Sequence, residues 1–298
     1  MHPDNKSKPI LIYGPTASGK TARSLEIARE LSPGGKPGAE IISADSMLVY
    51  RGMDIGTAKP SPEERKEIPH HLVDIRNPDQ DWTVADFIAQ AETLVPEIQN
   101  RNRTPIIVGG TGLYFWCLTQ GFQFPMAEAD PELRAILEEQ AKHDALALHA
   151  ELEKVDPAAA KRIHANDQKR LVRALEVFKL TGRPISEAQK ERRPVLKEYQ
   201  LIKMDLPREE LYERINRRVD QMIERGLIEE VKALLLRGYT REMKSMQALG
   251  YKETIDFLSG IWGNPEDPAV KTIYIEELKK RTRNFGRRQM NWLKRLHA

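Results

Sequence analysis

The chain has 298 residues, of which 40% are hydrophobic and 31% charged, and its net charge is +3. These values are ordinary for a globular protein with room for one large domain or two small ones. The segment Met1–Lys6 has no apolar stretch typical of a secretory signal, and no run reaches the roughly 18 apolar residues of a membrane span. The single cysteine, Cys117, excludes an internal disulfide and a cysteine-rich zinc site. We therefore expect a protein of the reducing cytoplasm without a membrane partner.

The positive charge is concentrated in two segments. Residues 121–160 carry three Lys/Arg against nine Asp/Glu, whereas residues 161–200 carry eleven against five. Between Lys279 and Arg295 there are eight basic residues and no acidic one. If neighbouring acids do not balance these segments, they indicate a polyanionic partner larger than a nucleotide. The alternative is a pair of ordinary solvated helix faces.

The first third of the chain alternates short apolar runs with helical patterns. Ile10–Tyr13 ends at a glycine and is typical of a buried strand, and a helix is expected over Thr21–Leu31. Similar strands are expected at Glu40–Ala44 and Pro105–Val108, with a helix over Val84–Asn100 before the latter. Strands that alternate with helices predict an α/β fold with a parallel sheet.

The pattern then becomes helical. From Pro131 to about Gln189 only helical periodicity is present, and a strand-like segment returns at Tyr199–Met204. Helices are expected after it, near residues 208–225, 227–237 and 269–297. We interpret residues 123–199 as an all-helical insertion into an α/β core formed by residues 1–122 and 200–298.

A phosphate-binding loop follows the first predicted strand. The pattern G-x-x-x-x-G-K-[ST] is matched by Gly14, Pro15, Thr16, Ala17, Ser18, Gly19, Lys20 and Thr21. Its glycines let backbone N–H groups surround an anion at a helix N-terminus. Lys20 would contact terminal phosphate oxygens, and the Thr21 hydroxyl suits a Mg²⁺ ligand. The alternative, a chance glycine-rich turn, does not explain the strand before the loop and the helix after it.

The loop lacks the usual partners of nucleotide hydrolysis. The strand at residues 105–108 ends in Gly109-Gly110-Thr111 where many NTPases place an aspartate, and no Asn-Lys-x-Asp sequence reads a guanine. The predicted site therefore grips a diphosphate without evident machinery for hydrolysing a γ-phosphate.

Asp45 follows the second predicted strand, in Ser43-Ala44-Asp45-Ser46. The carboxyl ends of parallel strands face the ligand crevice, so Asp45 is expected beside the phosphate loop. Its carboxylate could accept a proton from a nucleophile or hold Mg²⁺ through water. The alternative is a turn residue, because Asp-Ser is common in turns.

Several blocks resemble the tRNA dimethylallyltransferase family. In the first half these are Gly14–Thr21, Ile42–Pro60, His70–Ile75 and Val108–Tyr114. The similarity continues through Asp130–Arg134, Asp167–Glu176, Leu249–Glu253 and Arg287–Trp292, and thus covers nearly the whole chain. A single cysteine does not allow the zinc-finger tail of many eukaryotic relatives, so the bacterial type is favoured.

The resemblance implies a P-loop NTPase-like core and a defined reaction. The N6 amine of the adenine next to the anticodon, on its 3′ side, attacks C1 of dimethylallyl diphosphate, and diphosphate leaves. It assigns Asp45 as the general base, Lys20 and Arg218 to the diphosphate, and Thr21 to Mg²⁺. The helical insertion would clamp the tRNA anticodon loop, whose target base must leave its stack to react. We expect a monomer, because the enzyme must wrap around tRNA.

The same resemblance assigns tRNA contacts to Asp45, Ser46, Met47, Leu48, Thr111, Arg134, Lys169, Arg170, Leu171, Val172, Arg173, Gln247, Ala248, Leu249, Gly250, Tyr251, Lys252, Arg287, Arg288, Gln289, Met290, Asn291, Trp292, Leu293 and Lys294. Without it, Thr111 would be a turn residue, and Arg134 and Arg218 would be surface charges. Four positions depart from the common pattern: Leu48 replaces glutamine, Gly286-Arg287 replaces Ala-Lys, and Asn291 replaces threonine.

Two other functions share part of this pattern. A small-molecule or nucleotide kinase would use the phosphate loop and Mg²⁺, but would leave the basic segments and the block at residues 42–60 unexplained. A third possibility is a non-enzymatic RNA-binding protein with a nucleotide switch. Transfer of a prenyl group to adenosine without ATP distinguishes the transferase from both.

Overall fold

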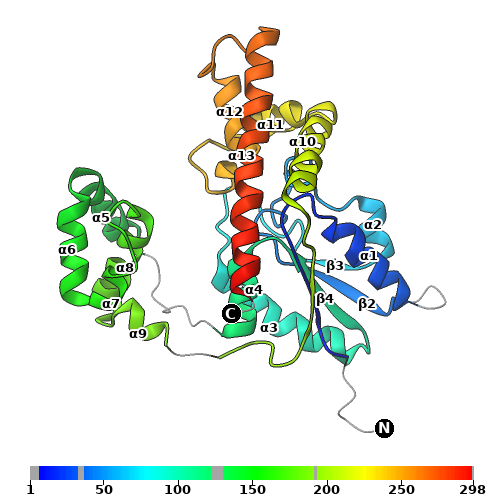
Figure 1. Cartoon of the computed structure of the whole chain (residues 1–298), viewed down its shortest axis with the longest axis horizontal. Helices are drawn as coiled ribbons and strands as arrows, with labels where there is room; N and C mark the ends of the chain where they lie inside the picture. Colours follow the sequence, from blue (N-terminus) through cyan, green and yellow to red (C-terminus); the bar gives the residue numbers. More distant parts are fainter. Residues whose placement is uncertain (1–6, 33–36, 122–129, 191–192, 297–298) are drawn as a thin grey trace. The chain divides into compact units, whose positions relative to one another are not determined.

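The computed structural model describes residues 7–32, 37–121, 130–190 and 193–296. The chain forms two units (Figure 1). Residues 1–116 and 196–298 form the α/β unit, and residues 117–195 form the helical unit. The sequence places these boundaries at 123 and 199, and position 123 lies outside the described residues.

Five parallel strands form the sheet of the α/β unit, in the order β3-β2-β4-β1-β5. Their bounds are β1 Ile10–Tyr13, β2 Ala39–Ser43, β3 His70–His71, β4 Thr104–Gly109 and β5 Gln200–Lys203. In the central register, Leu11 lies between Ile107 and Leu201. The α/β fold expected from the sequence is confirmed. Only β3 was not expected, since two histidines carry no apolar pattern.

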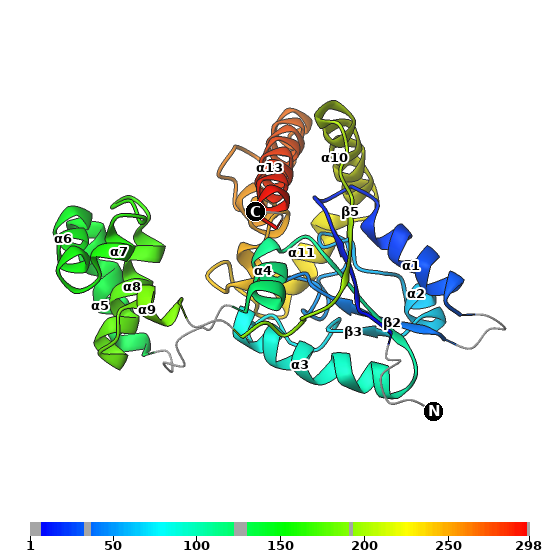
Figure 2. The same ribbon diagram turned by 60° about the horizontal axis from the view of Figure 1, so that its bottom comes forward.

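Helices cover both faces of this sheet (Figure 2). Alternate residues of β1 point to opposite faces, and Ile10 and Ile12 pack against α1, Lys20–Glu30. On the other face, the ring of Tyr13 meets Phe115 of α4, Gly112–Gln120, with centroids 5.0 Å apart. Helix α3, Val84–Asn100, stacks on α4 through Phe87 and Tyr114, at 4.2 Å. These layers hold the carboxyl ends of the strands rigidly.

Three helices of the α/β unit were missed from the sequence, namely those at Pro62–Glu67, Gly112–Gln120 and Tyr251–Leu258. Helix α2, Pro62–Glu67, begins with a capping box in which Ser61 and Glu64 satisfy each other's backbone N–H groups. This local signature was readable in the sequence. Helix α4 is apolar on all sides, so its periodicity gave no indication of a helix.

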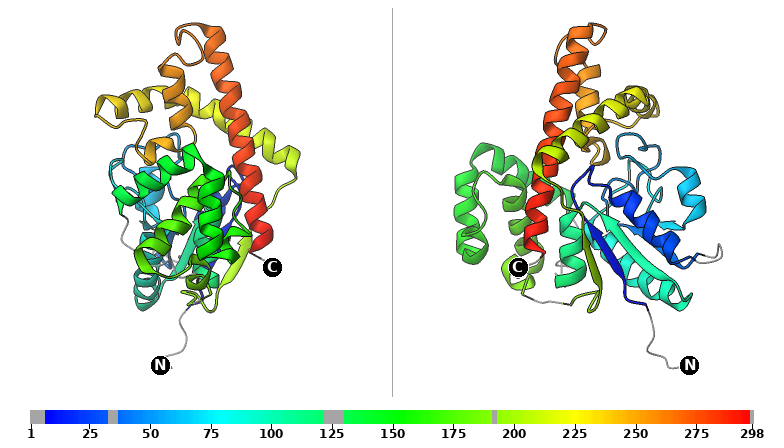
Figure 3. Two further views of the ribbon diagram at one scale, coloured as in Figure 1. Left: turned by 90° about the vertical axis from the view of Figure 1, so that its left-hand side faces the viewer. Right: turned by 45° about the vertical axis from the view of Figure 1, so that its right-hand side comes forward.

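The C-terminal part of the α/β unit contains α10 Arg208–Glu224, α11 Leu227–Leu236, the 3₁₀ turn η2 Ser245–Gln247, α12 Tyr251–Leu258 and α13 Pro268–Arg295. Helix α13 packs against α10 and α12 and continues to the sheet (Figure 3). Near its C-terminus, Trp292 contacts Trp116 of α4 edge to face, with centroids 6.4 Å apart. This long helix links the C-terminal helices to the sheet.

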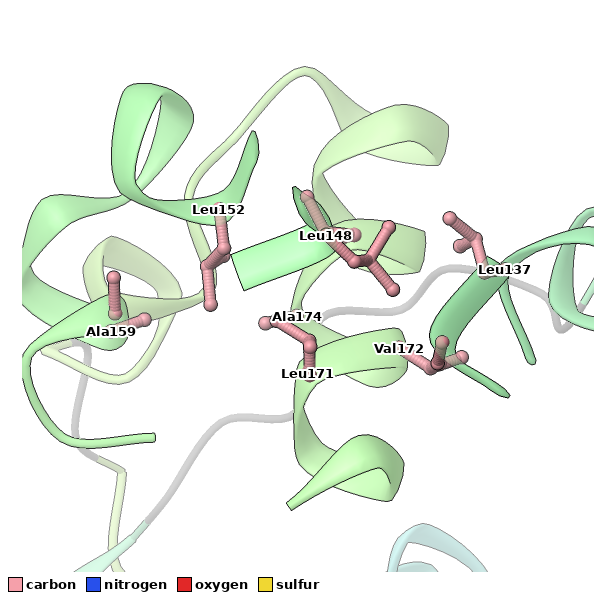
Figure 4. Packing of buried hydrophobic residues seen from close by; sticks show 10 residues of the cluster. Leu137, Leu148, Leu152, Ala159, Leu171, Val172 and Ala174 are labelled. Carbon is pink, nitrogen blue, oxygen red and sulfur yellow. The ribbon is translucent and has the colours of Figure 1, made fainter. Parts of the chain in front are cut away.

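The helical unit contains α5 Pro131–His143, α6 Ala145–Val155, α7 Pro157–Ala160, α8 Gln168–Thr181 and α9 Ile185–Ala188. Aspartates cap four of these helices, and each accepts a backbone hydrogen bond: Asp130, Asp144, Asp156 and Asp167. Its core is built from α5, α6, α7 and α8 (Figure 4). None of the helices within the described ranges is both long and apolar enough to cross a membrane.

Candidate active site

A cavity of about 280 Å³ lies in the α/β unit, at the carboxyl ends of the strands. Such edges of parallel sheets are the usual place for a ligand. The structure gathers many of the predicted residues around it: Thr16, Lys20, Thr21, Asp45, Ser46, Met47, Leu48, Thr111, Arg218, Ala248, Leu249, Gly250 and Gln289. Residues separated by more than 200 positions in the sequence thus share one cavity.

The phosphate loop connects β1 to α1. Gly19 adopts a left-handed conformation with φ of 89°, which a glycine tolerates without strain, and α1 begins at Lys20, one residue earlier than expected. The Lys20 Nζ donates to the Pro15 carbonyl at 2.6 Å. The Ser18 hydroxyl is buried and has no hydrogen-bond partner among the described residues. Polar groups of this loop are therefore arranged for a ligand.

Two cations of the cavity lack a full set of anionic partners. Burial and the neighbouring Arg218 charge together lower the pKa of Lys20 to about 7, while the Asp45 charge opposes the shift. Burial also lowers the pKa of Arg218. The Arg218 Nε is buried without a partner within the described chain, and its Nη2 donates to the Thr57 carbonyl at 3.4 Å. Two partly buried cations that repel each other are costly unless an anion joins them, so the cavity suits a multiply charged anion.

Asp45 lies directly beyond β2, on the cavity wall. Its Oδ1 accepts the Met47 backbone N–H at 2.8 Å, so the turn expected of an Asp-Ser pair is present. The same carboxylate interacts electrostatically with Lys20 and Arg218. The Thr111 hydroxyl accepts the Ser46 N–H at 3.3 Å and so joins the end of β4 to this turn. The turn therefore holds the carboxylate beside both cations.

The cavity also has an apolar wall that we did not find from the sequence. It is formed by Val219 and Met222 of α10, Leu278 and Phe285 of α13, and Leu249. Apolar residues at helical spacing in α10 indicate a buried face but do not distinguish a core from a ligand wall. Together with the cations, this wall suits a ligand that has an anionic head and an apolar part.

Gln289 forms hydrogen bonds within the protein through its side chain and its backbone carbonyl. Its Oε1 accepts the Thr16 N–H at 2.7 Å, its Nε2 donates to the Gly110 carbonyl at 2.9 Å, and its own carbonyl accepts the Tyr13 hydroxyl at 2.9 Å. The side chain is buried. These bonds fasten α13 to the phosphate loop, so the geometry favours a structural role over the tRNA contact expected for Gln289.

The cavity offers oxygen ligands that fit Mg²⁺. The described residues contain no cluster of three or more His, Cys, Asp or Glu side chains that could enclose a metal. Mg²⁺ bound with phosphates usually keeps several waters and takes only one or two protein ligands. The exposed Thr21 hydroxyl and the Asp45 carboxylate both line the cavity, so these residues fit that pattern.

The C-terminal basic segment is divided between paired and exposed side chains. In its first turn, Lys279 pairs with Asp220 and Glu276, Lys280 with Glu277, and Arg281 with Glu277 and Glu253. The expectation that neighbouring acids do not balance the segment is wrong there, because folding brings acids from α10 and α12. Arg287, Arg288, Lys294 and Arg295 are exposed and form no ion pair with the described residues.

The other residues expected to contact tRNA in segments 247–252 and 287–294 differ in exposure. Gln247 and Asn291 are exposed, and Lys252, Met290 and Trp292 are half-buried. Ala248, Gly250 and Tyr251 are buried against the cavity or the core. The side chain of Leu293 lies outside the described residues.

The helical unit places its predicted RNA residues in three environments. Lys169 and Arg170 are exposed, and Arg170 lies 3.4 Å from Asp167. Leu171 and Val172 are buried in the core of the unit, so their side chains cannot make the contact expected of them. Arg134 and Arg173 both bind the fully buried Glu176, with N–O distances of 2.8 and 2.7 Å. Glu176 was not identified from the sequence.

Comparison with known proteins agrees with this geometry. The family model described as IPP transferase matches residues 48–296. A tRNA dimethylallyltransferase of Heliobacterium modesticaldum is 48% identical over 96% of this chain and 86% of its own, and one of Pelotomaculum thermopropionicum is 45% identical over 99% and 90%.

Solved structures give the same result. The tRNA isopentenylpyrophosphate transferase of Bacillus halodurans is 43% identical, with a TM-score of 0.64 over 97% of this chain and 87% of that one. A eukaryotic dimethylallyltransferase acting on tRNA is 29% identical, with a TM-score of 0.79 over 96% and 70%. The chain therefore belongs to the IPP transferase family, the family of the tRNA dimethylallyltransferases.

Proposed function

We propose that this enzyme transfers a dimethylallyl group from dimethylallyl diphosphate to N6 of the adenine on the 3′ side of the anticodon in tRNA. The proposal rests on the two half-buried cations, Lys20 and Arg218, beside the Asp45 carboxylate in a cavity with an apolar wall. A prenyl diphosphate combines the two features that this cavity requires, a multiply charged head and an apolar tail.

The phosphate loop would bind the leaving group. As the bond between C1 and the diphosphate oxygen breaks, negative charge grows on that oxygen. Lys20, Arg218 and the N–H groups at the start of α1 are preorganised to stabilise this charge. Since both side chains are in place before the ligand binds, little reorganisation is needed during the reaction. Mg²⁺ held by Thr21 and the diphosphate oxygens would supply further positive charge.

Asp45 would act on the nucleophile. The adenine N6 forms a bond to C1 while the C1–oxygen bond breaks and diphosphate departs. The nitrogen then carries one proton too many, and the Asp45 carboxylate accepts it. An aromatic amine is a weak nucleophile, which is why a positioned base is needed. The turn bond from Met47 N–H to Asp45 Oδ1 leaves Oδ2 for this proton.

The RNA would be held by exposed cations of both units. Lys169 and Arg170 of the helical unit, and Arg287, Arg288 and Lys294 of α13, are suited to phosphate contacts. The helical unit would serve as the tRNA clamp. An unpaired loop base can be extruded at a cost of a few kcal/mol, which brings N6 to the cavity.

A kinase is disfavoured by the same cavity. A kinase needs a site for a second, phosphate-accepting substrate, whereas Val219, Met222, Leu278 and Phe285 give this cavity an apolar lining on α10 and α13. The end of β4 carries glycines where an aspartate would organise Mg²⁺ and water.

The test is incubation of the protein with unmodified tRNA, Mg²⁺ and dimethylallyl diphosphate, followed by mass analysis of the nucleosides. We expect adenosine to gain one dimethylallyl unit without ATP. Phosphate transfer from ATP to a small molecule, with no change in the tRNA, would overturn the proposal.

A further inference from the structure

One carboxylate of the α/β unit binds four donors from two distant segments. On α11, the Glu230 Oε2 accepts the backbone N–H groups of Asp54 at 3.0 Å and Ile55 at 2.7 Å. The Glu230 Oε1 accepts the N–H of Gly56 at 3.2 Å and the hydroxyl of Tyr251 at 2.6 Å. Three successive N–H groups turned toward one carboxylate form an anion-binding nest, here filled by the protein itself.

The two segments that Glu230 joins form part of the cavity wall. Gly56, Thr57 and Ala58 line the cavity on one segment, and Ala248, Leu249 and Gly250 line it on the other. The segments also touch directly, because a Cβ added at Gly56 would lie 2.5 Å from the Tyr251 ring. Only a glycine permits this approach. Glu230 therefore sets the distance between two walls of the site.

The first segment also supports a cation of the site. The Thr57 carbonyl accepts the only hydrogen bond given by the Arg218 guanidinium within the described chain, from Nη2 at 3.4 Å. Thr57 directly follows the N–H groups that Glu230 binds. A displacement of this segment would move the carbonyl that orients Arg218.

We propose that Glu230 is a positioning residue of the transfer reaction. It holds residues 54–57 against residues 248–251 and, through the Thr57 carbonyl, orients Arg218 toward the diphosphate. This inference rests on the proposed function, because it assigns Arg218 to the leaving group. Glu230 itself contacts neither substrate.

Glu230→Gln is a sharp test because each carboxylate oxygen accepts from two donors. Whichever oxygen becomes the amide nitrogen, at least one backbone N–H of the nest then faces an N–H group and loses its acceptor. The variant should still fold. Residue 54 is also held by Lys59, whose buried Nζ binds Asp54 at 2.5 Å, Asp74 at 2.6 Å and the Tyr50 carbonyl at 2.7 Å.

The measurement is single-turnover transfer at saturating tRNA and dimethylallyl diphosphate. Its amplitude reports the fraction of competent enzyme, and its rate constant reports the geometry of the site. We expect Glu230→Gln to lower the rate constant by about 10- to 100-fold with little loss of amplitude, since small misplacements near a reacting centre have effects of this size. Tyr251→Phe keeps the ring over Gly56 but removes one bond, so a smaller decrease is expected.

Glu229→Gln is the matched control, because Glu229 is the exposed neighbour on the same helix and should leave the rate constant unchanged. A native rate constant with reduced amplitude for Glu230→Gln would mean that Glu230 only stabilises the fold, and would overturn the inference. An equal decrease in Glu229→Gln would also overturn it. If wild-type protein transfers nothing to tRNA, the proposed function itself fails, and this outcome is separate from the other two.

Discussion

The cavity of the α/β unit and the buried Glu176 of the helical unit treat charge in opposite ways. In the α/β unit, Lys20 and Arg218 face each other beside a single carboxylate, and the Arg218 Nε and Ser18 hydroxyl have no partner among the described residues. In the helical unit, the buried carboxylate of Glu176 binds two arginines, Arg134 and Arg173. Among the described residues, neither cation of the first centre forms an ion pair with its carboxylate, whereas both arginines of the second centre do.

This difference indicates different roles for the two units. A buried charge without a partner raises the free energy of the empty protein and is relieved when a ligand of opposite charge binds. A paired charge contributes to folding and to the orientation of its partners. We therefore interpret the α/β unit as the part of the protein that holds the reacting site. We interpret the helical unit as a surface whose side chains are already held in place before a ligand binds. The predictions below test this contrast, from the largest expected effect to the smallest.

Replacement of Asp45, the carboxylate beside Lys20 and Arg218, should have the largest effect on the transfer rate. Asp45→Asn should lower kcat by about 10²–10⁴, the range for a lost proton acceptor. The asparagine Oδ1 can still accept the Met47 N–H, so the turn should persist and dimethylallyl diphosphate should bind almost as before. Steady-state kinetics and donor titration check both points. Near-native turnover would exclude Asp45 as the base.

Removal of the Lys20 charge should change the affinity for dimethylallyl diphosphate and leave the affinity for tRNA unchanged. Lys20→Ala should weaken the binding of dimethylallyl diphosphate by about 10²-fold, because a desolvated charge pair is lost. Thr21→Ala should raise the Mg²⁺ concentration needed for half-maximal rate. Calorimetric titrations with donor and with tRNA measure the two affinities separately. If both variants lost only tRNA affinity, the phosphate-loop assignment would be wrong.

Charge removal should change stability in opposite directions in the two units. Glu176→Ala should lower the free energy of unfolding by about 2 kcal/mol, less than for a fully buried pair because Arg134 and Arg173 can turn to water. Lys20→Met should instead raise the Tm of the ligand-free protein. Thermal unfolding of both variants against wild type tests the contrast, and Tm changes of the same sign would contradict it.

The lowered pKa of Lys20, about 7, predicts proton uptake on donor binding. The folded, empty protein leaves Lys20 largely neutral above that pH, and the diphosphate favours the charged form. Donor binding at about pH 8 should therefore take up nearly one proton, and affinity should fall as pH rises above 7. Calorimetry in buffers of different ionisation enthalpy measures this uptake.

Lys20→Arg is the control for proton uptake, since arginine stays charged at every pH used. Any protons that the diphosphate itself exchanges remain in this variant, so the difference belongs to Lys20. Equal proton uptake in both proteins would assign it to the ligand.

The smallest effects are expected at exposed cations. Arg170→Ala and Arg288→Ala should each weaken tRNA binding and make the plot of log K against log salt shallower by about 0.7–0.9 for each lost phosphate contact. Donor affinity should not change. The matched controls are Lys179→Ala and Lys280→Ala, whose side chains pair with Glu151 and Glu277. Native slopes for Arg170→Ala and Arg288→Ala would place them off the RNA path.

Local patterns in the sequence were sufficient for most elements. The helix at Val84–Asn100 was predicted with its observed bounds, and the structure shows a capping box of Thr83 and Asp86 at its start. Strand β1 and the phosphate loop were also predicted from local patterns. Because the carboxyl ends of parallel strands face the ligand crevice, Asp45 was expected beside them. Helix α4 and strand β3 were missed because their stability comes from burial between other elements and not from their own periodicity.

For several predicted site residues, only packing in the folded protein decided whether the side chain is exposed or buried. Leu171 and Val172 share a basic helix with Lys169 and Arg170, and only the helical rotation decides which side chains face the core. The first turn of the C-terminal basic segment was paired by acids of other helices. Charge counts along a sequence cannot include partners that folding brings from elsewhere.

The sequence by itself determined the phosphate loop, its neighbouring carboxylate, the parallel α/β core and the family, because each of these follows from short-range patterns of residues. Only the tertiary structure decided that Gln289 fastens α13 to Thr16 and that Glu230 fills the nest at residues 54–56. These bonds join residues more than 170 positions apart. A glutamate on a charged helix looks the same in sequence whether it faces water or three backbone N–H groups, and only the fold brings those groups to it.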